Sequence, residues 1–199
     1  MNRLPQVTRN ILIINILVYI ITQLRPSFVG YFALFNPVSP MFHLWQPLTY
    51  MFLHGGFWHI FMNMFVLVMF APQLESIWGS RKFLTFYLVT GVGAGMVQML
   101  VEWLSGSYVP TVGASGAVYG LLMGYAMLFP DSRLMLIFPP IALKAKWWVL
   151  IWIVIELMSG FLSDGVAHFA HLGGMLFGFV LIMIWKKKGT MYDYYDYDE

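Results

Sequence analysis

Cysteine is absent from this 199-residue chain, which excludes disulfides, thiolate metal sites and a cysteine nucleophile. Charged residues are scarce as well. They make up 10% of the sequence, against about 25% in an ordinary soluble domain, while 60% of the residues are hydrophobic. The basic residues form no stripe that would bind nucleic acid. This composition is typical of a membrane protein with several spans, and the length suits one domain.

Six apolar stretches have roughly the length that a helix needs to cross a membrane, about 20 residues. They lie at residues 10–24, 57–77, 83–103, 114–130, 147–162 and 168–185. The sequence therefore predicts an all-α polytopic membrane protein with six transmembrane helices. Arg3 and Arg9 before the first stretch resemble the start of a signal peptide. No small-residue cleavage site follows, so we expect an uncleaved anchor.

The basic residues also predict the orientation, because lysine and arginine stay on the cytoplasmic side of a membrane. With both termini inside, ten of the eleven basic residues lie on the inner side, and only Arg25 lies outside. The second, fourth and sixth spans then run inwards from the outer side. Their first turns hold His59, Ser115 and His171, so these side chains are expected at a common depth in the outer leaflet.

Two of the segments outside the spans have a distinctive composition. Residues 25–56 are rich in proline and aromatic side chains, which favour the membrane interface, so we expect an interfacial loop with short helices. Residues 187–199 form a polar, acidic tail of a kind that stays disordered in the cytoplasm. The predicted organisation is a single six-helix domain over residues 1–186, followed by this tail, to which the sequence assigns no function.

Small residues at every fourth position predict contact between the fourth and sixth helices. They form two ladders, Gly116, Gly120 and Gly124 in the fourth helix and Ala170, Gly174 and Gly178 in the sixth. Membrane helices associate through such residues, because these let the backbones approach. Ser115 precedes one ladder and His171 follows the first member of the other, so ladders in register bring the two side chains together. Ladders of this kind also pack helix pairs that carry no site.

The depth of Ser115 indicates a submerged site. About 15 residues separate Ser115 from Pro130, which is roughly 22 Å of helix, whereas the hydrocarbon core is about 30 Å thick. If Pro130 marks the inner boundary, Ser115 lies below the outer surface. Polar side chains at that depth line a protein interior or a water-filled cavity, so we expect a water-accessible cavity here.

A serine hydroxyl becomes a nucleophile when a base takes its proton, and histidine is the usual base near neutral pH. No aspartate or glutamate follows His171 at a position that would orient it, so we expect Ser115 and His171 to form a dyad without a third member. Tyr119 lies one turn after Ser115 on the same helix face. Its ring either packs against the imidazole or simply fills space between helices.

The oxyanion of a tetrahedral intermediate needs hydrogen-bond donors. The backbone amide of Ser115 is a candidate, because it lies at a helix N-terminus where amide groups are free. His59 and Asn63 are four residues apart and share a helix face, so they are candidates as well. Alternatively, they form a polar contact that only holds the second helix in place.

Three motifs together resemble the rhomboid family of intramembrane serine proteases. They are His54-x4-His59-x3-Asn63, Gly113-x-Ser115-Gly116-x-x-Tyr119 and Ala170-His171-x-x-Gly174-x-x-x-Gly178. The resemblance covers residues 10–186 and implies a rhomboid-like bundle. The site roles that it implies are Ser115 as nucleophile, His171 as general base, His59, Asn63 and the Ser115 amide as oxyanion hole, and Tyr119, His54, Gly113 and Gly116 as supporting residues.

The resemblance also implies how the protein acts. Rhomboids cleave single-span membrane proteins near the outer end of the transmembrane segment, after a small residue and without a cofactor or metal. The implied partners are such substrates and the lipid bilayer, with no nucleic acid. The fifth helix and the loop at about 159–167 resemble the family's substrate gate and cap. The compact core implies a bacterial cytoplasmic membrane, with the site open to the outer side.

The chain departs from the family pattern at one place in the first loop. Many rhomboids have Trp-Arg where this sequence has Trp45-Gln46. This difference puts in doubt the contacts that stabilise the loop, but not the chemistry.

Other polar residues have both structural and functional interpretations. Glu156 lies near the middle of the fifth span, where an ionisable group is costly. It is expected either to face the interior in its protonated form or to bond to a neighbouring helix, and a structural role is favoured over a catalytic one. Glu75 is expected to anchor the second loop. His54 is expected to hydrogen-bond at the mouth of the cavity or to water, and His168 to be a capping or loop residue.

Two other functions compete with proteolysis. A metal-dependent membrane protein would explain why His54, His59, His168 and His171 gather on one side, although no His-Glu-x-x-His motif accompanies them. A non-catalytic rhomboid-like binder of transmembrane helices is the second alternative. Such proteins lack the serine or the histidine, whereas this chain has both.

Overall fold

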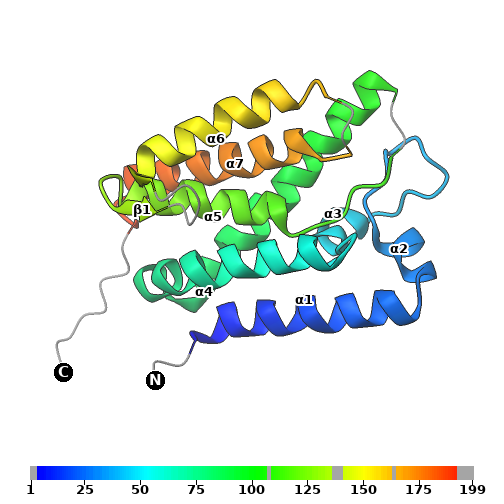
Figure 1. The fold of residues 1–199 in the computed structure, drawn as a ribbon, viewed down its shortest axis with the longest axis horizontal. Helices are drawn as coiled ribbons and strands as arrows, with labels where there is room; N and C mark the ends of the chain where they lie inside the picture. Colours follow the sequence, from blue (N-terminus) through cyan, green and yellow to red (C-terminus); the bar gives the residue numbers. More distant parts are fainter. Residues whose placement is uncertain (1–3, 107–108, 136–140, 163–164, 192–199) are drawn as a thin grey trace.

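The computed structural model describes residues 4–106, 109–135, 141–162 and 165–191. Within these ranges the chain is mostly helical (Figure 1), as the sequence predicts. The elements in chain order are α1 (Gln6–Leu24), α2 (Ser27–Phe32), α3 (Gln46–Thr49), η1 (Tyr50–Phe52), α4 (Phe57–Ser105), α5 (Ser115–Leu128), β1 (Arg133–Met135), β2 (Ala142–Lys144), α6 (Ala145–Ser159) and α7 (His168–Lys187). Most of the predicted acidic tail, residues 192–199, lies outside the described residues.

Three of these helices, α1, α4 and α7, are long and apolar enough to cross a membrane by length and composition. Large apolar side chains on them are exposed, such as Leu17 on α1 and Met183 on α7, and an extended exposed apolar surface marks a membrane protein. Helices α5 and α6 are shorter, with 14 and 15 residues. The six-span count and the orientation therefore stay predictions.

Helix α4 consists of two arms that reverse direction at Gly79. Gly79 has a φ of 72°, a left-handed conformation that glycine adopts without steric cost. The second arm returns toward the start of the first. A hydrogen bond shows this: the hydroxyl of Tyr50, a residue shortly before α4, donates to the Gly91 carbonyl of the second arm (2.7 Å). The two arms correspond to the predicted stretches 57–77 and 83–103.

Helix α5 packs against α7 through the two glycine ladders. A Cβ added at Gly174 would collide with the Gly116 carbonyl, and one added at Gly178 would come 3.2 Å from the Gly120 carbonyl oxygen. Two backbones this close leave no room for larger side chains. The predicted contact between these helices is therefore present and in register, and it sets the relative height of their first turns.

The segment before α4 is held together by Gln46. This side chain is fully buried, and its amide donates to the carbonyls of Met41 (2.8 Å) and Tyr31 (3.3 Å) while accepting from the Phe35 amide (3.3 Å). Gln46 is the residue at which the sequence departs from the rhomboid pattern. Its neutral side chain thus supplies contacts that stabilise this segment.

Glu75, near the end of the first α4 arm, fixes the start of α1. Its carboxylate accepts hydrogen bonds from the Val7 amide (2.9 Å), the Thr8 amide and hydroxyl (2.7 Å each) and the Ser80 hydroxyl (2.7 Å). The first amides of a helix have no partner within the helix, so the carboxylate satisfies two of them. The expected contact with the second loop is limited to Ser80.

A short hairpin follows α5, which the sequence did not predict. Strands β1 and β2 pair antiparallel, with Arg133 opposite Lys144. Near their base, the ammonium groups of Lys144 and Lys146 each lie 2.9 Å from the same oxygen of Asp131. These hydrogen bonds lower the pKa of the Asp131 carboxyl to about 2.

Candidate active site

The first turns of α4, α5 and α7 border one cavity of about 1670 Å³. Its wall includes His59, Asn63, Ser115, Tyr119 and His171, and most of the other lining side chains are apolar. Small-molecule pockets measure roughly 300–1,000 Å³. The larger size and apolar wall of this cavity suit a segment of polypeptide.

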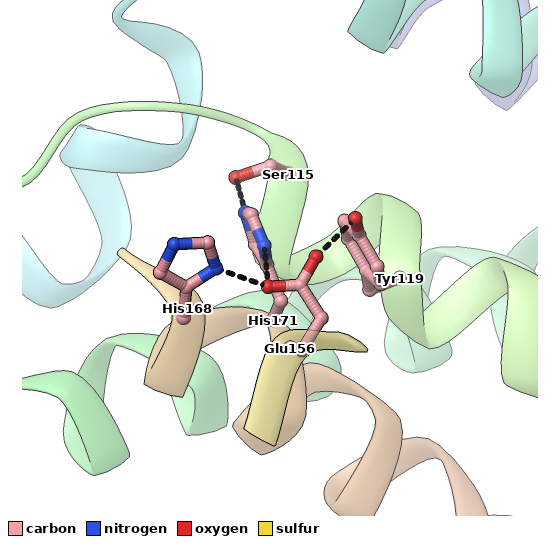
Figure 2. A network of polar contacts seen from close by, with 5 residues as sticks. All are labelled: Ser115, Tyr119, Glu156, His168 and His171. Atoms are coloured by element: carbon pink, nitrogen blue, oxygen red, sulfur yellow. Dashed lines mark hydrogen bonds and ion pairs between the residues drawn. The ribbon is translucent and has the colours of Figure 1, made fainter. Parts of the chain in front are cut away.

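Ser115 and His171 lie within hydrogen-bonding distance at this cavity, as Figure 2 shows. The Ser115 hydroxyl is 2.9 Å from Nε2 of His171. Ser115 is the first residue of α5, and His171 lies in the first turn of α7. The proximity that two ladders in register require is therefore present, while the roles of nucleophile and base stay predictions.

The Tyr119 ring stacks on His171, with ring centroids 4.2 Å apart and planes inclined by 10°. Of the two interpretations of this residue, packing against the imidazole is the one that the structure has. In addition, the Tyr119 hydroxyl donates a hydrogen bond to Oε1 of Glu156 (2.5 Å), a contact that the sequence did not predict.

Glu156 of α6 lies beside His171, contrary to the expectation that no carboxylate orients this imidazole. Its Oε2 is 2.9 Å from Nδ1 of His171 (Figure 2). The distance is that of a hydrogen bond, but Nδ1 of His171 has no hydrogen-bond partner of suitable direction among the described residues. The expectation considered only residues that follow His171, whereas Glu156 precedes it by 15 residues on the neighbouring helix.

His168 shares the same carboxylate oxygen. Its Nδ1 lies 2.6 Å from Oε2 of Glu156, and it is the first residue of α7. The sequence led to the expectation of a capping or loop residue and did not predict this contact with Glu156. One signal in the sequence did point here: an ionisable residue in an apolar helix needs a polar partner, and His168 and His171 open the next helix.

His59 and Ser115 border a small space that glycine leaves open. The Gly55 amide donates to Nδ1 of His59 (3.4 Å), an arrangement that in a neutral imidazole assigns the ring proton to Nε2. A Cβ at Gly113 would lie 2.8 Å from this Nε2 and 3.5 Å from the Ser115 hydroxyl oxygen. Gly113 also has a φ of 133°, which residues with a Cβ rarely adopt. Only glycine therefore keeps this space free.

Asn63 lies one turn after His59 on the cavity wall. Its side-chain amide donates one N–H to the His59 carbonyl (2.8 Å). Because a carboxamide has two N–H groups, the same side chain retains a second donor.

His54 is not among the described residues that line the cavity. It is buried edge-on against His59, with ring centroids 5.0 Å apart, and neither ring nitrogen has a hydrogen-bond partner among the described residues. Burial, together with the neighbouring His59, lowers the pKa of His54 to about 3. The expected hydrogen bond at the cavity mouth is therefore not present among the described residues, while a hydrogen bond to water stays a prediction. His54 packs against His59.

Glu156, His168 and His171 also form a group with the composition of a metal site. One ligand atom from each lies within 4.8 Å of the other two, and two imidazole nitrogens with a carboxylate oxygen are ligands that zinc accepts. This group differs from the four histidines that the sequence suggested, since it includes neither His54 nor His59.

A family model described as "Rhomboid domain" matches residues 41–188. The match covers most of the chain and includes every residue of the cavity wall named above. The chain belongs to the rhomboid family. This assignment supports the description of the molecule as a membrane protein of a protease family.

Several curated proteins resemble this rhomboid over most of its length. "Presenilin-associated rhomboid-like protein, mitochondrial" of Mus musculus is 32% identical over 176 residues, which are 84% of this chain and 46% of the relative. "Rhomboid-like protease 3" of Toxoplasma gondii is 28% identical over 159 residues, 78% of this chain and 57% of the relative. "RHOMBOID-like protein 6, mitochondrial" of Arabidopsis thaliana is 39% identical over 137 residues, 69% and 42% of the two chains. The chain spans about half the length of these relatives.

These relatives correct the expected location. The sequence led to the expectation of a bacterial cytoplasmic membrane, but the mouse and Arabidopsis relatives are mitochondrial by name. These names argue against the expected bacterial membrane. The expectation was wrong because it rested on the compact core, which does not depend on the membrane that contains it.

Proposed function

We propose that this rhomboid is an intramembrane serine endopeptidase that cleaves transmembrane segments of single-span membrane proteins near one membrane face. The observation that carries the proposal is the distance of 2.9 Å between the Ser115 hydroxyl and Nε2 of His171. An imidazole at this distance is placed to take the hydroxyl proton. Both residues lie on the wall of a cavity large enough for a peptide segment.

In the proposed reaction, Ser115 attacks the carbonyl carbon of the scissile bond. The bond from Oγ to carbon forms, the hydroxyl proton passes to Nε2 of His171, and the carbonyl π electrons move to the oxygen. The carbon–nitrogen bond then breaks, and His171 gives its proton to the departing amine. Water repeats these steps on the acyl-enzyme, which releases the new carboxyl end and returns the proton to Ser115. Atoms and charges balance without a cofactor.

The oxyanion is proposed to form in the space next to Gly113. The Nε2 proton of His59 faces this space, and the Ser115 amide belongs to the free amides of a helix start. The second N–H of Asn63 is the third donor. Each donor acts most strongly in the transition state, when charge develops on the oxygen in a site from which water is excluded.

The proposed arrangement in the membrane follows the sequence. One domain over residues 1–186 contains six spans, and both ends of this domain lie on the same side. Helix α6 and the loop 159–167, of which residues 163 and 164 are not described, form the substrate gate and cap. The exposed apolar side chains of α6, such as Val154 and Met158, are consistent with a helix that faces lipid and an approaching substrate.

The test is cleavage of a model single-span protein in detergent, followed on gels. The wild type is expected to give the product, while Ser115→Ala and His171→Ala give none. Ser76→Ala is the matched control, because Ser76 is exposed and, within the described part of the chain, bonds only to the Pro72 carbonyl of its own helix. Substrate that is bound but uncleaved by the wild type would refute the proposal in favour of a non-catalytic binder.

A metal-dependent activity is the second candidate, favoured by the proximity of Glu156, His168 and His171. It predicts that a chelator abolishes cleavage and that Ser115→Ala still cleaves. The serine mechanism predicts the reverse for both, so the same gels decide between the candidates.

A further inference from the structure

Glu156 is unusual among the residues of α6. The buried residues of this helix are Ala145, Val149 and Glu156, and the large side chains around Glu156, such as Leu157 and Met158, are exposed and apolar. Glu156 is only 3% exposed. An ionisable group in such a helix is costly unless it faces the protein interior and has partners. Its partners therefore indicate why it is there.

Both carboxylate oxygens of Glu156 are occupied by groups of the candidate active site. Tyr119 donates its hydroxyl proton to Oε1 (2.5 Å). Oε2 lies 2.6 Å from Nδ1 of His168 and 2.9 Å from Nδ1 of His171. An ionised carboxylate only accepts hydrogen bonds, so all three contacts are satisfied together when each imidazole carries its proton on Nδ1.

This proton position decides whether His171 acts as a base. A neutral imidazole carries one proton, and the hydrogen bond at one nitrogen sets which one has it. With the proton on Nδ1 facing Glu156, Nε2 has a free lone pair toward the Ser115 hydroxyl (2.9 Å). With the proton on Nε2, the ring cannot take a proton from Ser115. A carboxylate next to Nδ1 therefore favours the form of His171 that can accept the Ser115 proton at Nε2.

We infer that Glu156 is a positioning residue, which holds His171 with its proton on Nδ1 and extends the Ser115–His171 pair to a Ser–His–Glu triad. The inference rests on the proposed function. The triad differs from the dyad that the sequence predicts, and the negative charge of Glu156 also stabilises the imidazolium that forms when His171 accepts the proton. Hydrogen bonds of this kind are often poorly aligned in the free enzyme and tighten in the substrate complex. This accounts for the unsuitable direction of the contact between Glu156 and Nδ1 of His171.

Two neighbours keep the carboxylate in place. The Tyr119 hydroxyl donates to Oε1 of Glu156, while the Tyr119 ring stacks on His171. One side chain therefore positions both Glu156 and His171. His168, the first residue of α7, contacts Oε2. The carboxylate cannot rotate away from His171 without losing both contacts.

Glu156→Gln is the central test, because it keeps the shape of the side chain and removes its charge. We expect kcat for the model substrate to fall by about 10²–10⁴-fold, by analogy with the loss of roughly 10⁴-fold when the triad aspartate of a serine protease becomes asparagine. KM should stay within about twofold, since the interaction is made in the transition state. Glu156→Asp, which retains the charge, should recover part of the activity.

Glu75→Gln is the matched control, because it makes the same change at an equally buried carboxylate that contacts no imidazole among the described residues. Its kcat should equal that of the wild type. Should Glu156→Gln and Glu156→Asp both keep wild-type kcat, or both change only KM and thermal stability, the positioning role would be overturned and Glu156 would be a structural clamp of α6.

A readout without substrate keeps the inference testable even if Glu156→Gln does not fold. Nitrogen NMR of ¹⁵N-histidine-labelled wild type distinguishes protonated from unprotonated ring nitrogens, with the His171 signals assigned by their loss in His171→Ala. The expected result is a protonated Nδ1 in His171, and a protonated Nε2 would overturn the inference. Wild type that neither cleaves nor reacts at Ser115 would instead refute the proposed function.

Discussion

Two buried carboxylates lie at opposite ends of α7, and the fold uses them differently. Glu75 lies beside the α4 turn, from which Lys82 reaches over the ring of Trp185 near the end of α7. Glu156 contacts His171 at the start of α7. Each glutamate is 3% exposed, and each accepts contacts from at least two other segments of the chain.

The donors account for the difference between the two ends. Glu75 accepts from backbone amides and hydroxyls, whose protons stay in place at physiological pH. Glu156 faces two imidazoles, which gain and lose protons near neutral pH. A buried carboxylate with several donors therefore stabilises the bundle at the Glu75 end, whereas at the Glu156 end the same arrangement suits proton transfer.

The largest effect is expected from disrupting the packing of α7 against α5, because α7 connects the two ends. Gly174→Leu should abolish cleavage and lower the melting temperature Tm, because a side chain at this position enters the Gly116 backbone. Overpacking commonly costs about 1–3 kcal/mol, and a 1 Å displacement of catalytic groups costs about 10²-fold in rate. Thermal unfolding and gel cleavage in detergent measure both effects.

Gly56→Leu is the control for this variant, because a Cβ at Gly56 meets nothing within 4 Å and its φ of 177° is ordinary extended backbone. It should fold and cleave. A fully active Gly174→Leu would contradict the account of how the ladders hold Ser115 and His171 together.

The next effect concerns the active-site end alone. Asn63→Ala should lower kcat by about 10²–10³-fold, equivalent to about 2.7–4 kcal/mol for one oxyanion donor, and leave measurable activity from the remaining donors. Tm should change little. Steady-state kinetics with the model substrate make the measurement. Unchanged turnover would remove Asn63 from the oxyanion hole.

Glu75→Gln tests the other end. We expect the free energy of unfolding to fall by about 1.5–3 kcal/mol, the contribution of a hydrogen bond to a charged group, because the amide cannot satisfy all of the Val7, Thr8 and Ser80 donors. The kcat should not change. Denaturant unfolding in detergent measures the loss. A drop in kcat at wild-type stability would erase the distinction between the two carboxylates.

The smallest effect is expected at an exposed carboxylate, Asp131. Its pKa is lowered from 3.8 to about 2 by Lys144 and Lys146. Because the folded-state pKa lies below the unfolded one, these contacts stabilise the protein above pH 3.8 and lose this effect as the pH falls toward 2. Asp131→Asn should lower Tm slightly at neutral pH, less so at high salt. A Tm difference between wild type and variant that grows on acidification would contradict this assignment.

The sequence predicts those parts of the site that depend on helix backbones. Helix periodicity and the glycine ladders fix how α5 and α7 approach, so the proximity of Ser115 and His171 follows from spacing alone. His59 and Asn63 were likewise predicted to share a helix face, and both line the cavity.

The parts that the sequence did not predict depend on side-chain direction and helix rotation. The contact of Glu156 with His171 requires a particular rotation of α6, which no repeat in the sequence encodes. Gln46 lies in an irregular loop, where no periodicity indicates which carbonyls it meets. Glu75 binds the start of α1, 67 residues away from Thr8, and such long-range capping has no local pattern.

The most direct test of the account is the site at which a fluorophosphonate reacts. Such reagents phosphonylate serine hydroxyls that an adjacent base has activated. Mass spectrometry of labelled wild type is predicted to find the adduct on Ser115, and His171→Ala is predicted to carry none. No adduct on the wild type, an adduct on another serine, or equal labelling of Ser115 in both proteins would contradict the claim that His171 activates Ser115.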